Sequence, residues 1–252
     1  MKIVIALLKR EILEHKNIWR VPLVLIVIAV LVKLSLSVGN LSINLDVPDQ
    51  LQLDGAINSA LDGVVASALN SMNYLIALVM FVVSIFYALS CLYNERQDES
   101  VLFWRSLPIS DGLTIASKLI VALILIPIVI VLSQTIVAVV FFDVQAFEYL
   151  STYYSYSFNG LLKMILWSLV PIIAWCVLCS QVAKKNPFLL AFIAPIILIL
   201  IDKLFLNGAI SQTFVINRLT GVSDYNITTF VYGLIFSAIC ISLAIAKRKQ
   251  RF

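Results

Sequence analysis

Long apolar runs separated by short polar turns constrain the fold of this chain more than any other feature. No residue between Ile227 and Ala246 is charged, and a helix of that length crosses the ~30 Å hydrocarbon core of a bilayer. Charged residues form 13% of the 252 residues, whereas soluble domains usually contain about 25%. Because lipid offers no hydrogen-bond partners to an open backbone, such runs fold as helices. The sequence therefore predicts an all-α polytopic membrane protein built as a single transmembrane domain.

Six membrane spans are expected from the hydropathy pattern, preceded by an amphipathic helix over residues 2–19. In that first helix Leu8, Ile12 and Trp19 recur near helical spacing opposite a charged face, so we expect it to lie in the membrane interface. Pro127 is expected to kink the third span. The expected spans are about 21–38, 70–93, 113–142, 161–180, 187–205 and 226–246.

The distribution of basic residues predicts the orientation of these spans. Of the 18 basic residues, 14 fall in the N-terminal helix and the adjoining Arg20, residues 94–118, residues 181–186 and the C-terminal tail. The other side of the membrane receives Lys33, Lys163, Lys203 and Arg218. Under the positive-inside rule the first side is cytosolic. We therefore expect a multi-pass protein of the cell membrane (the bacterial inner or plasma membrane) with both termini in the cytosol.

Motifs for chemistry within this chain are not apparent. The sequence has no phosphate loop of the form GxxxxGK[ST], no HExxH and no GxSxG. His15 is the only histidine, and Cys176 and Cys179 form a CxxC inside an apolar run, where core packing is the expected role. We expect no catalytic residue, no bound metal and no nucleic-acid partner.

Ionisable residues within the apolar runs lie near the ends of those runs. They are Lys33, Lys118, Lys163, Asp202 and Lys203. Secondary transporters and channels usually keep such groups along the path, and an intramembrane enzyme needs a nucleophile, a base or a metal set. Neither pattern is evident, although both classes stay open as alternatives. The polar triplet 133–135 can bond across helices or line a conduit.

A polar segment between the second and third spans predicts a cytosolic helix at about 95–107. Acidic residues at its start suit the helix dipole, and Pro108 cannot continue it. Phe103, Trp104 and Leu107 share one face, while Leu102 lies within an acidic stripe on the other. That pattern fits a helix with one face on the membrane helices and Leu102 presented to a partner. An amphipathic loop helix lying on lipid is the alternative.

These features together resemble the permease subunit of an ABC-2-type exporter. That family has an amphipathic N-terminal helix, six spans, and a loop with Glu-Arg, a Thr or Ser, and a leucine-rich segment ending Leu-Pro-hydrophobic-Ser. Here the corresponding residues are Glu95-Arg96, Ser100 and the stretch ending Leu107-Pro108-Ile109-Ser110. The chain departs from the pattern in having Ser100 where Thr is common and 97–99 in place of a glycine-containing spacer.

The resemblance implies a transport function coupled to a partner ATPase. It makes the polar segment the coupling helix, seated in a separate ATP-binding subunit that carries ATP and Mg²⁺; no cofactor is expected in this chain. A second copy or a related permease completes the conduit among membrane lipids. The implied coupling residues are Glu95, Arg96, Ser100, Leu102, Phe103, Trp104, Leu107 and Pro108.

Aromatic and hydroxyl side chains within the spans suggest the class of cargo. Tyr87, Trp167, Trp175 and Tyr232 lie in runs that are almost free of charge. Such a lining suits an amphipathic or hydrophobic molecule, although the same residues can simply pack helices together. Taken with the resemblance, this lining implies an exporter subunit for such a molecule, and we expect no enzymatic activity in the chain itself.

Overall fold

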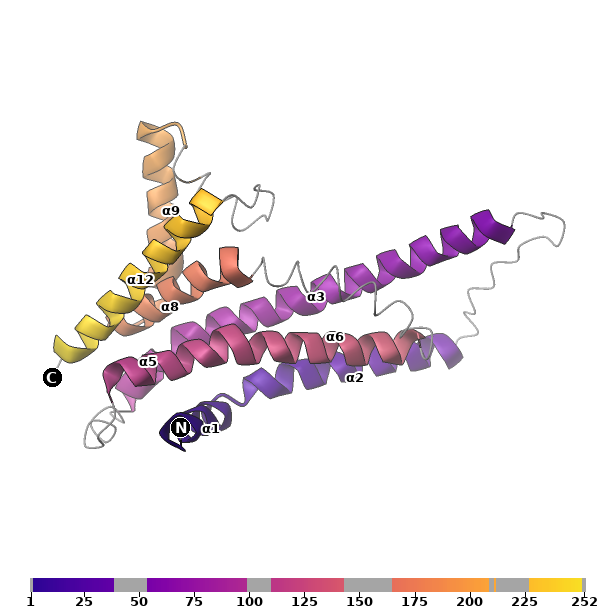
Figure 1. Ribbon diagram of the computed structural model, residues 1–252, viewed down its shortest axis with the longest axis horizontal. Helices are drawn as coiled ribbons and strands as arrows, with labels where there is room; N and C mark the ends of the chain where they lie inside the picture. The colour runs from indigo at the N-terminus through magenta and orange to yellow at the C-terminus, as the bar shows by residue number, and fades with distance from the viewer. Residues whose placement is uncertain are drawn as a thin grey trace. The chain divides into compact units, whose positions relative to one another are not determined.

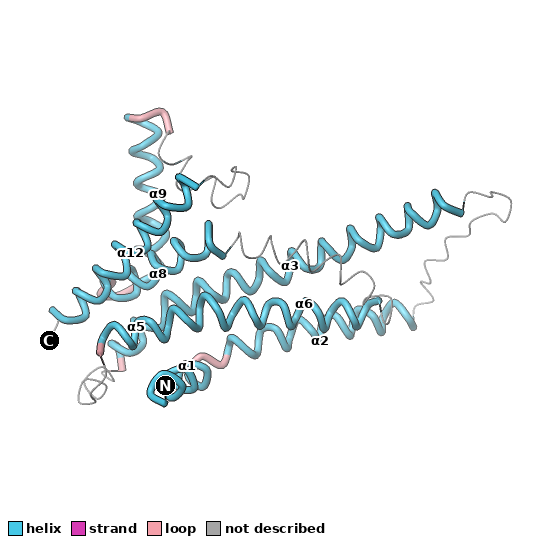
Figure 2. The backbone as a smooth tube through the Cα atoms, viewed as in Figure 1, coloured by secondary structure: helices cyan, strands magenta, loops and turns pink. Residues whose placement is uncertain are grey.

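The computed structural model describes residues 2–38, 54–98, 110–142, 165–208, 211 and 227–250. Every regular element in these ranges is a helix, as Figures 1 and 2 show. Six of the helices described are long and apolar enough to cross a membrane, which confirms the all-helical character and the six apolar helices of the predicted fold. They are Asn17–Ser35, Ser71–Gln97, Asp111–Phe141, Ile165–Val182, Pro187–Phe205 and Ile227–Arg248.

The helices divide into two compact units. Unit 1 comprises Met1–His15, Val82–Ile126 and Ser157–Phe252. Its helices are α1 (Lys2–Glu14), the C-terminal part of α3 (Asp54–Gln97), α5 (Asp111–Ile120), α8 (Val170–Val182), α9 (Pro187–Phe205) and α12 (Ile227–Gln250). Within this unit α8 packs against α9 and α12, and α5 contacts α1 and α12. Figure 1 shows α8 and α12 side by side.

Unit 2 comprises Lys16–Phe81 and Pro127–Tyr156. It contains α2 (Asn17–Val38), the N-terminal part of α3 and nearly all of α6 (Ile126–Phe142). The amide nitrogen of Gln134 on α6 donates to the Asn73 carbonyl on α3 over 3.0 Å. This bond confirms that the polar triplet contains a residue that bonds across helices, while the Thr135 hydroxyl donates to a carbonyl of its own helix, Val131, over 2.8 Å.

The N-terminal helix is shorter than the pattern predicts. α1 ends at Glu14, and α2 begins at Asn17. The Lys16 carbonyl accepts the amides of Trp19 over 3.1 Å and Arg20 over 3.0 Å, so a new helix starts there. The prediction that Trp19 belongs to the first helix is therefore wrong. No proline, glycine or change of periodicity marks the break, and the apolar stripe continues through it.

The second membrane helix extends beyond both ends predicted for its span. α3 begins at Asp54, well before the expected start of the span at about residue 70, and continues to Gln97. Glu95 and Arg96 are thus in its last turn, and the prediction that a separate helix begins near Glu95 is wrong. Hydropathy marks where the lipid ends, whereas Glu, Arg and Gln are good helix formers that continue the helix past that point. Residues 99–109 lie outside the described ranges.

Two prolines are preceded by π-helical turns. One turn, Val121–Leu125, precedes Pro127, and the other, Ile165–Leu169, precedes Pro171. A proline lacks an N–H group and its ring crowds the carbonyl four residues earlier. A wider turn relieves that crowding. The kink expected at Pro127 stays a prediction.

Candidate functional site

A cluster of buried charges in unit 1 is the most distinctive site in the described part of the chain. Glu11 and Lys118 are each 1% exposed, and a buried charge is stable only when it is paired and hydrogen-bonded. The pairs connect α1, α3, α5 and α12. We call this cluster the buried ion network; its members are Arg10, Glu11, Glu95, Lys118 and Arg248, together with the more exposed Glu14 and Asp111 at its edge.

Glu11 anchors α1 in the network through both of its carboxylate oxygens. The Lys118 ammonium lies 2.7 Å from Glu11 Oε1, and the Tyr87 hydroxyl donates to Oε2 over 3.0 Å. Lys118 also donates to the Cys91 carbonyl over 3.3 Å. Tyr87, Cys91 and Glu95 are four residues apart on α3, so they lie on one face of the helix. That face presents a hydroxyl, a carbonyl and a carboxylate to the same region.

Glu95 is the point where three cations meet. Its carboxylate pairs with Arg10, lies 3.1 Å from Lys118 Nζ, and lies 3.2 Å from Arg248 Nη1. The Arg248 Nε donates to Asp111 Oδ1 over 3.0 Å. Arg248 therefore contacts one carboxylate at the end of α3 and another at the start of α5.

The start of α5 is fixed by a capping residue. Ser110 is extended, and its hydroxyl accepts the Leu113 amide over 3.3 Å, as an N-cap does. Asp111 follows in the first turn, where the helix dipole favours an acid. The Ser110 cap thus fixes where α5 begins, and with it the position of Asp111 in the first turn.

Arg96 fastens the end of α3 to the end of α8. Its guanidinium donates to the carbonyls of Ser180 and Ala183, the latter over 2.9 Å. The Ser180 hydroxyl in turn accepts the amides of Leu92 over 3.2 Å and Tyr93 over 3.0 Å. Carbonyls at a helix C-terminus lack partners within the helix, and an arginine is well suited to satisfy them.

The predicted coupling residues have different outcomes. Glu95 and Arg96 are brought together with other elements of unit 1, and the Glu95 carboxylate is buried instead of lying on the exposed acidic face that the sequence predicts. The other predicted residues lie outside the described ranges: Ser100, Leu102, Phe103, Trp104, Leu107 and Pro108. Sequence reasoning missed the roles of Glu11, Lys118 and Arg248.

The aromatic residues proposed to face a cargo make contacts within the chain. The Tyr87 hydroxyl donates to Glu11, the Trp167 indole donates to Thr229 over 3.4 Å, and the Trp175 indole donates to the Ala191 carbonyl over 3.2 Å. These bonds favour the packing alternative for these three residues. Tyr232 is 54% exposed.

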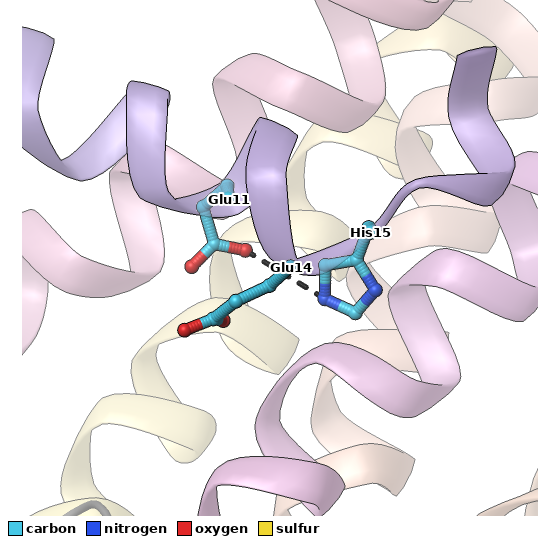
Figure 3. A group of neighbouring side chains, drawn as sticks. All are labelled: Glu11, Glu14 and His15. Carbon is cyan, nitrogen blue, oxygen red and sulfur yellow. Dashed lines mark ion pairs between the residues drawn. The ribbon is translucent and has the colours of Figure 1, made fainter.

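Three side chains at the end of α1 have the composition of a metal site. Figure 3 shows Glu11, Glu14 and His15 as neighbours, with an ion pair drawn between Glu11 and His15, and one ligand atom from each lies within 4.8 Å of the others. A divalent cation prefers such oxygen and imidazole ligands. However, both carboxylates already face cations, because Glu11 pairs with Lys118 over 2.7 Å and Glu14 with Arg10 over 2.9 Å. The positive charges of Lys118 and Arg10 would repel a metal ion there, so the geometry favours an ion-paired cluster.

His15 and Arg10 respond differently to partial burial. Burial lowers the pKa of His15 below its usual 6.5, and the nearby Glu11 only partly opposes that shift. Burial alone would also lower the pKa of Arg10, but Glu95 and then Glu11 and Glu14 outweigh it and raise the net value. His15 packs edge-to-face on Tyr87 with ring centroids 4.7 Å apart. A lowered pKa favours the neutral imidazole of His15 at pH 7, beside the charged groups of the buried ion network.

Replacing His15 with glutamine should reduce the sensitivity of the protein to acid. Because the pKa of His15 is lower in the folded state, the unfolded state binds more protons as pH falls below about 6.5, and stability is lost there. Glutamine does not titrate, so His15→Gln should lose less stability than wild type on acidification. Between pH 7.5 and pH 5 the Tm of the variant should therefore rise relative to the Tm of wild type. Thermal unfolding in detergent measures it, and an unchanged difference would contradict the burial argument.

Comparison with known proteins identifies no relative: no protein-family model, curated protein or solved structure matches this chain.

Proposed function

We propose that this chain is the transmembrane permease subunit of an ATP-driven exporter of the ABC-2 type, coupled to a separate ATP-binding subunit. The observation that carries the proposal is the buried ion network at both ends of the segment between α3 and α5. Glu95 precedes that segment and Asp111 follows it, and both contact Arg248. The segment is the one that the resemblance identifies as the coupling helix.

Transmission of force requires a firm connection between the receiving segment and the membrane helices. Glu95 pairs with Arg10 on α1, Lys118 on α5 and Arg248 on α12. Breaking a buried ion pair leaves an uncompensated charge and costs about 3–5 kcal/mol. A displacement of the end of α3 is therefore passed to α1, α5 and α12 more readily than it breaks these pairs.

The expected orientation agrees with this arrangement. The network gathers the ends of α1, α3, α5 and α12, all of which the count of basic residues assigns to the cytosol. Arg96 adds the end of α8, which the same count assigns to that side. A partner ATPase would approach this face in the cytosol, where ATP is available.

Other helices offer surfaces to lipid or to a second permease. Leu23, Val27 and Leu31 on α2 and Phe192 and Leu198 on α9 are exposed in this chain. In a bilayer, apolar side chains of this kind meet lipid tails or another transmembrane helix. These surfaces are compatible with a permease that works as a pair, either with its own copy or with a relative, and we propose an amphipathic or hydrophobic cargo from the low charge of the spans.

A secondary transporter is the second candidate, and one observation favours it. Glu95 and Lys118 are titratable, lie within membrane-spanning helices and are buried. Such groups mark proton or ion relays in many transporters. Here each has an opposite charge within 3.1 Å, which is also what a structural pair requires. The two candidates differ in their source of energy: the permease would use ATP hydrolysis by its partner, and the secondary transporter would use an ion gradient.

The test is purification of the full chain from its native membranes with whatever remains bound to it. We expect an ABC ATP-binding subunit to co-purify, and we expect Leu102→Glu to release it, because a buried apolar contact would receive a charge. Asn186→Glu is the matched control, since it adds the same charge to the exposed turn before α9. Reconstituted transport that needs an ion gradient and no ATP, or a wild-type preparation without an ATPase, would refute the proposal.

A further inference from the structure

Arg248 differs from the other basic residues of the C-terminal tail in where it lies. The sequence assigns the tail only a role in orientation, and Lys247 is exposed accordingly. Arg248, the next residue, is 3% exposed and lies between Glu95 and Asp111. Orientation alone requires no burial, and a buried guanidinium is costly unless it is paired. The position of Arg248 therefore needs a second explanation.

The geometry of the contacts supplies that explanation. Arg248 Nη1 lies 3.2 Å from Glu95 Oε2, and Arg248 Nε lies 3.0 Å from Asp111 Oδ1. Two different nitrogens of one planar group thus contact carboxylates that belong to two helices. A guanidinium holds its donors in a fixed fork, whereas a lysine ammonium is a single point charge on a flexible stem. Only arginine provides both contacts with a fixed angle between them.

We propose that Arg248 is a positioning residue that holds together the end of α3 and the start of α5, and so fixes the base of the segment between them. This inference rests on the proposed function for its consequence, which is that Arg248 sets how much transport each ATP hydrolysed produces. When Arg248 joins the two helix ends, a force on the segment between them displaces α3, α5 and α12 together. Without Arg248, the end of α3 and the start of α5 move independently, and less of the force reaches the membrane helices.

The structural part of the inference can be measured without any ATPase. Spin labels on cysteines at Gln97 and Gly112 flank the bridge; Gln97 is exposed, and a Cβ at Gly112 meets no atom within 4 Å. We expect a narrow distance distribution with Arg248 present and a broader one in Arg248→Gln. Arg248→Lys should lie between them, because it keeps the charge but loses the fork. Lys247→Gln is the matched control and should leave the distribution unchanged.

The functional part uses the complex with its ATP-binding subunit. We expect Arg248→Gln to keep ATP hydrolysis while the transport per ATP falls roughly tenfold, the usual scale for a lost charge-assisted bond. Asp111→Asn should reduce transport less, and it should add little in the Arg248→Gln background, since the bridge is already broken. Partial rescue by Arg248→Lys distinguishes positioning from a general loss of folding.

The outcomes separate this inference from the proposed function. A distance distribution that does not change in Arg248→Gln overturns the inference, whatever the chain transports. A broader distribution with unchanged transport per ATP also overturns it, because the bridge would then have no role in coupling. If wild type carries no ATPase, the proposed function fails, and the distance measurement still decides whether Arg248 holds the two helix ends.

Discussion

Replacing Lys118 with methionine should lower the free energy of unfolding by about 3–5 kcal/mol and the Tm by roughly 10 °C. Methionine fills a similar volume, so the loss comes from charge and not from a cavity. Lys118 lies 2.7 Å from Glu11 and 3.1 Å from Glu95, and it is 1% exposed. Its removal leaves Glu11 with the more distant Arg10, 3.4 Å away, as the nearest remaining cation.

Thermal unfolding of the detergent-solubilised protein measures this effect. Lys184→Met is the control, because Lys184 is exposed in the turn between α8 and α9. Adding Glu11→Gln to Lys118→Met should restore part of the stability, since it removes the abandoned charge. If Lys118→Met unfolds at the temperature of wild type, the network is not buried as described.

Glu95→Gln should also lower the free energy of unfolding by about 3–5 kcal/mol. In this variant the cations, and not an acid, lose their partner. The amide keeps the shape of the side chain but leaves Arg10, Lys118 and Arg248 around a neutral group. Two of these are arginines, which cannot lose their charge in a protein. The three cations then repel one another, and the elements that carry them should separate locally before the chain unfolds.

Hydrogen exchange shows which elements loosen. We expect faster exchange in α1 and in the last turns of α12 for Glu95→Gln, with α9 unchanged as an internal reference. Glu14→Gln is the control: its side chain is 47% exposed, and its pair with Arg10 is worth at most about 0.5 kcal/mol. Equal exchange in Glu95→Gln and Glu14→Gln would contradict the assignment of Glu95 as the centre of the network.

The membrane helices could be predicted because hydropathy is a local property of the sequence. α9 begins at Pro187 and ends at Phe205, the bounds that the sequence predicts, since proline is favoured in the first turn and polar residues flank the run. The ends of α1 and α3 could not be predicted in this way. The α1 break has no local signal, and α3 continues through Glu95 and Arg96 because charged residues end a hydrophobic run without ending a helix.

The buried ion network could be predicted only in part. The excess of basic residues that the positive-inside rule assigns to one side is visible in the sequence, and Glu11, Glu95 and Asp111 are acids in the segments expected on that same side. Which acid meets which base depends on contacts such as that between Lys118 and Glu11, which are 107 residues apart. No pattern in one sequence specifies such a pairing. The sequence therefore places Lys118 near the end of a span, and only the structure shows that its side chain is buried and paired with Glu11 and Glu95.

The continuity of α3 has a consequence for what the protein presents outside the membrane. A helix of 44 residues is about 66 Å long at 1.5 Å per residue, whereas the hydrocarbon core is about 30 Å thick and tilt absorbs only some 10 Å more. The candidate membrane span is the C-terminal stretch from Ser71. The turns of α3 from Asp54 to Asn70 therefore exceed the length that the hydrocarbon core requires, and we expect them to extend beyond it. On that side of the membrane, an antibody or protease is expected to reach these helical turns before the rest of α3.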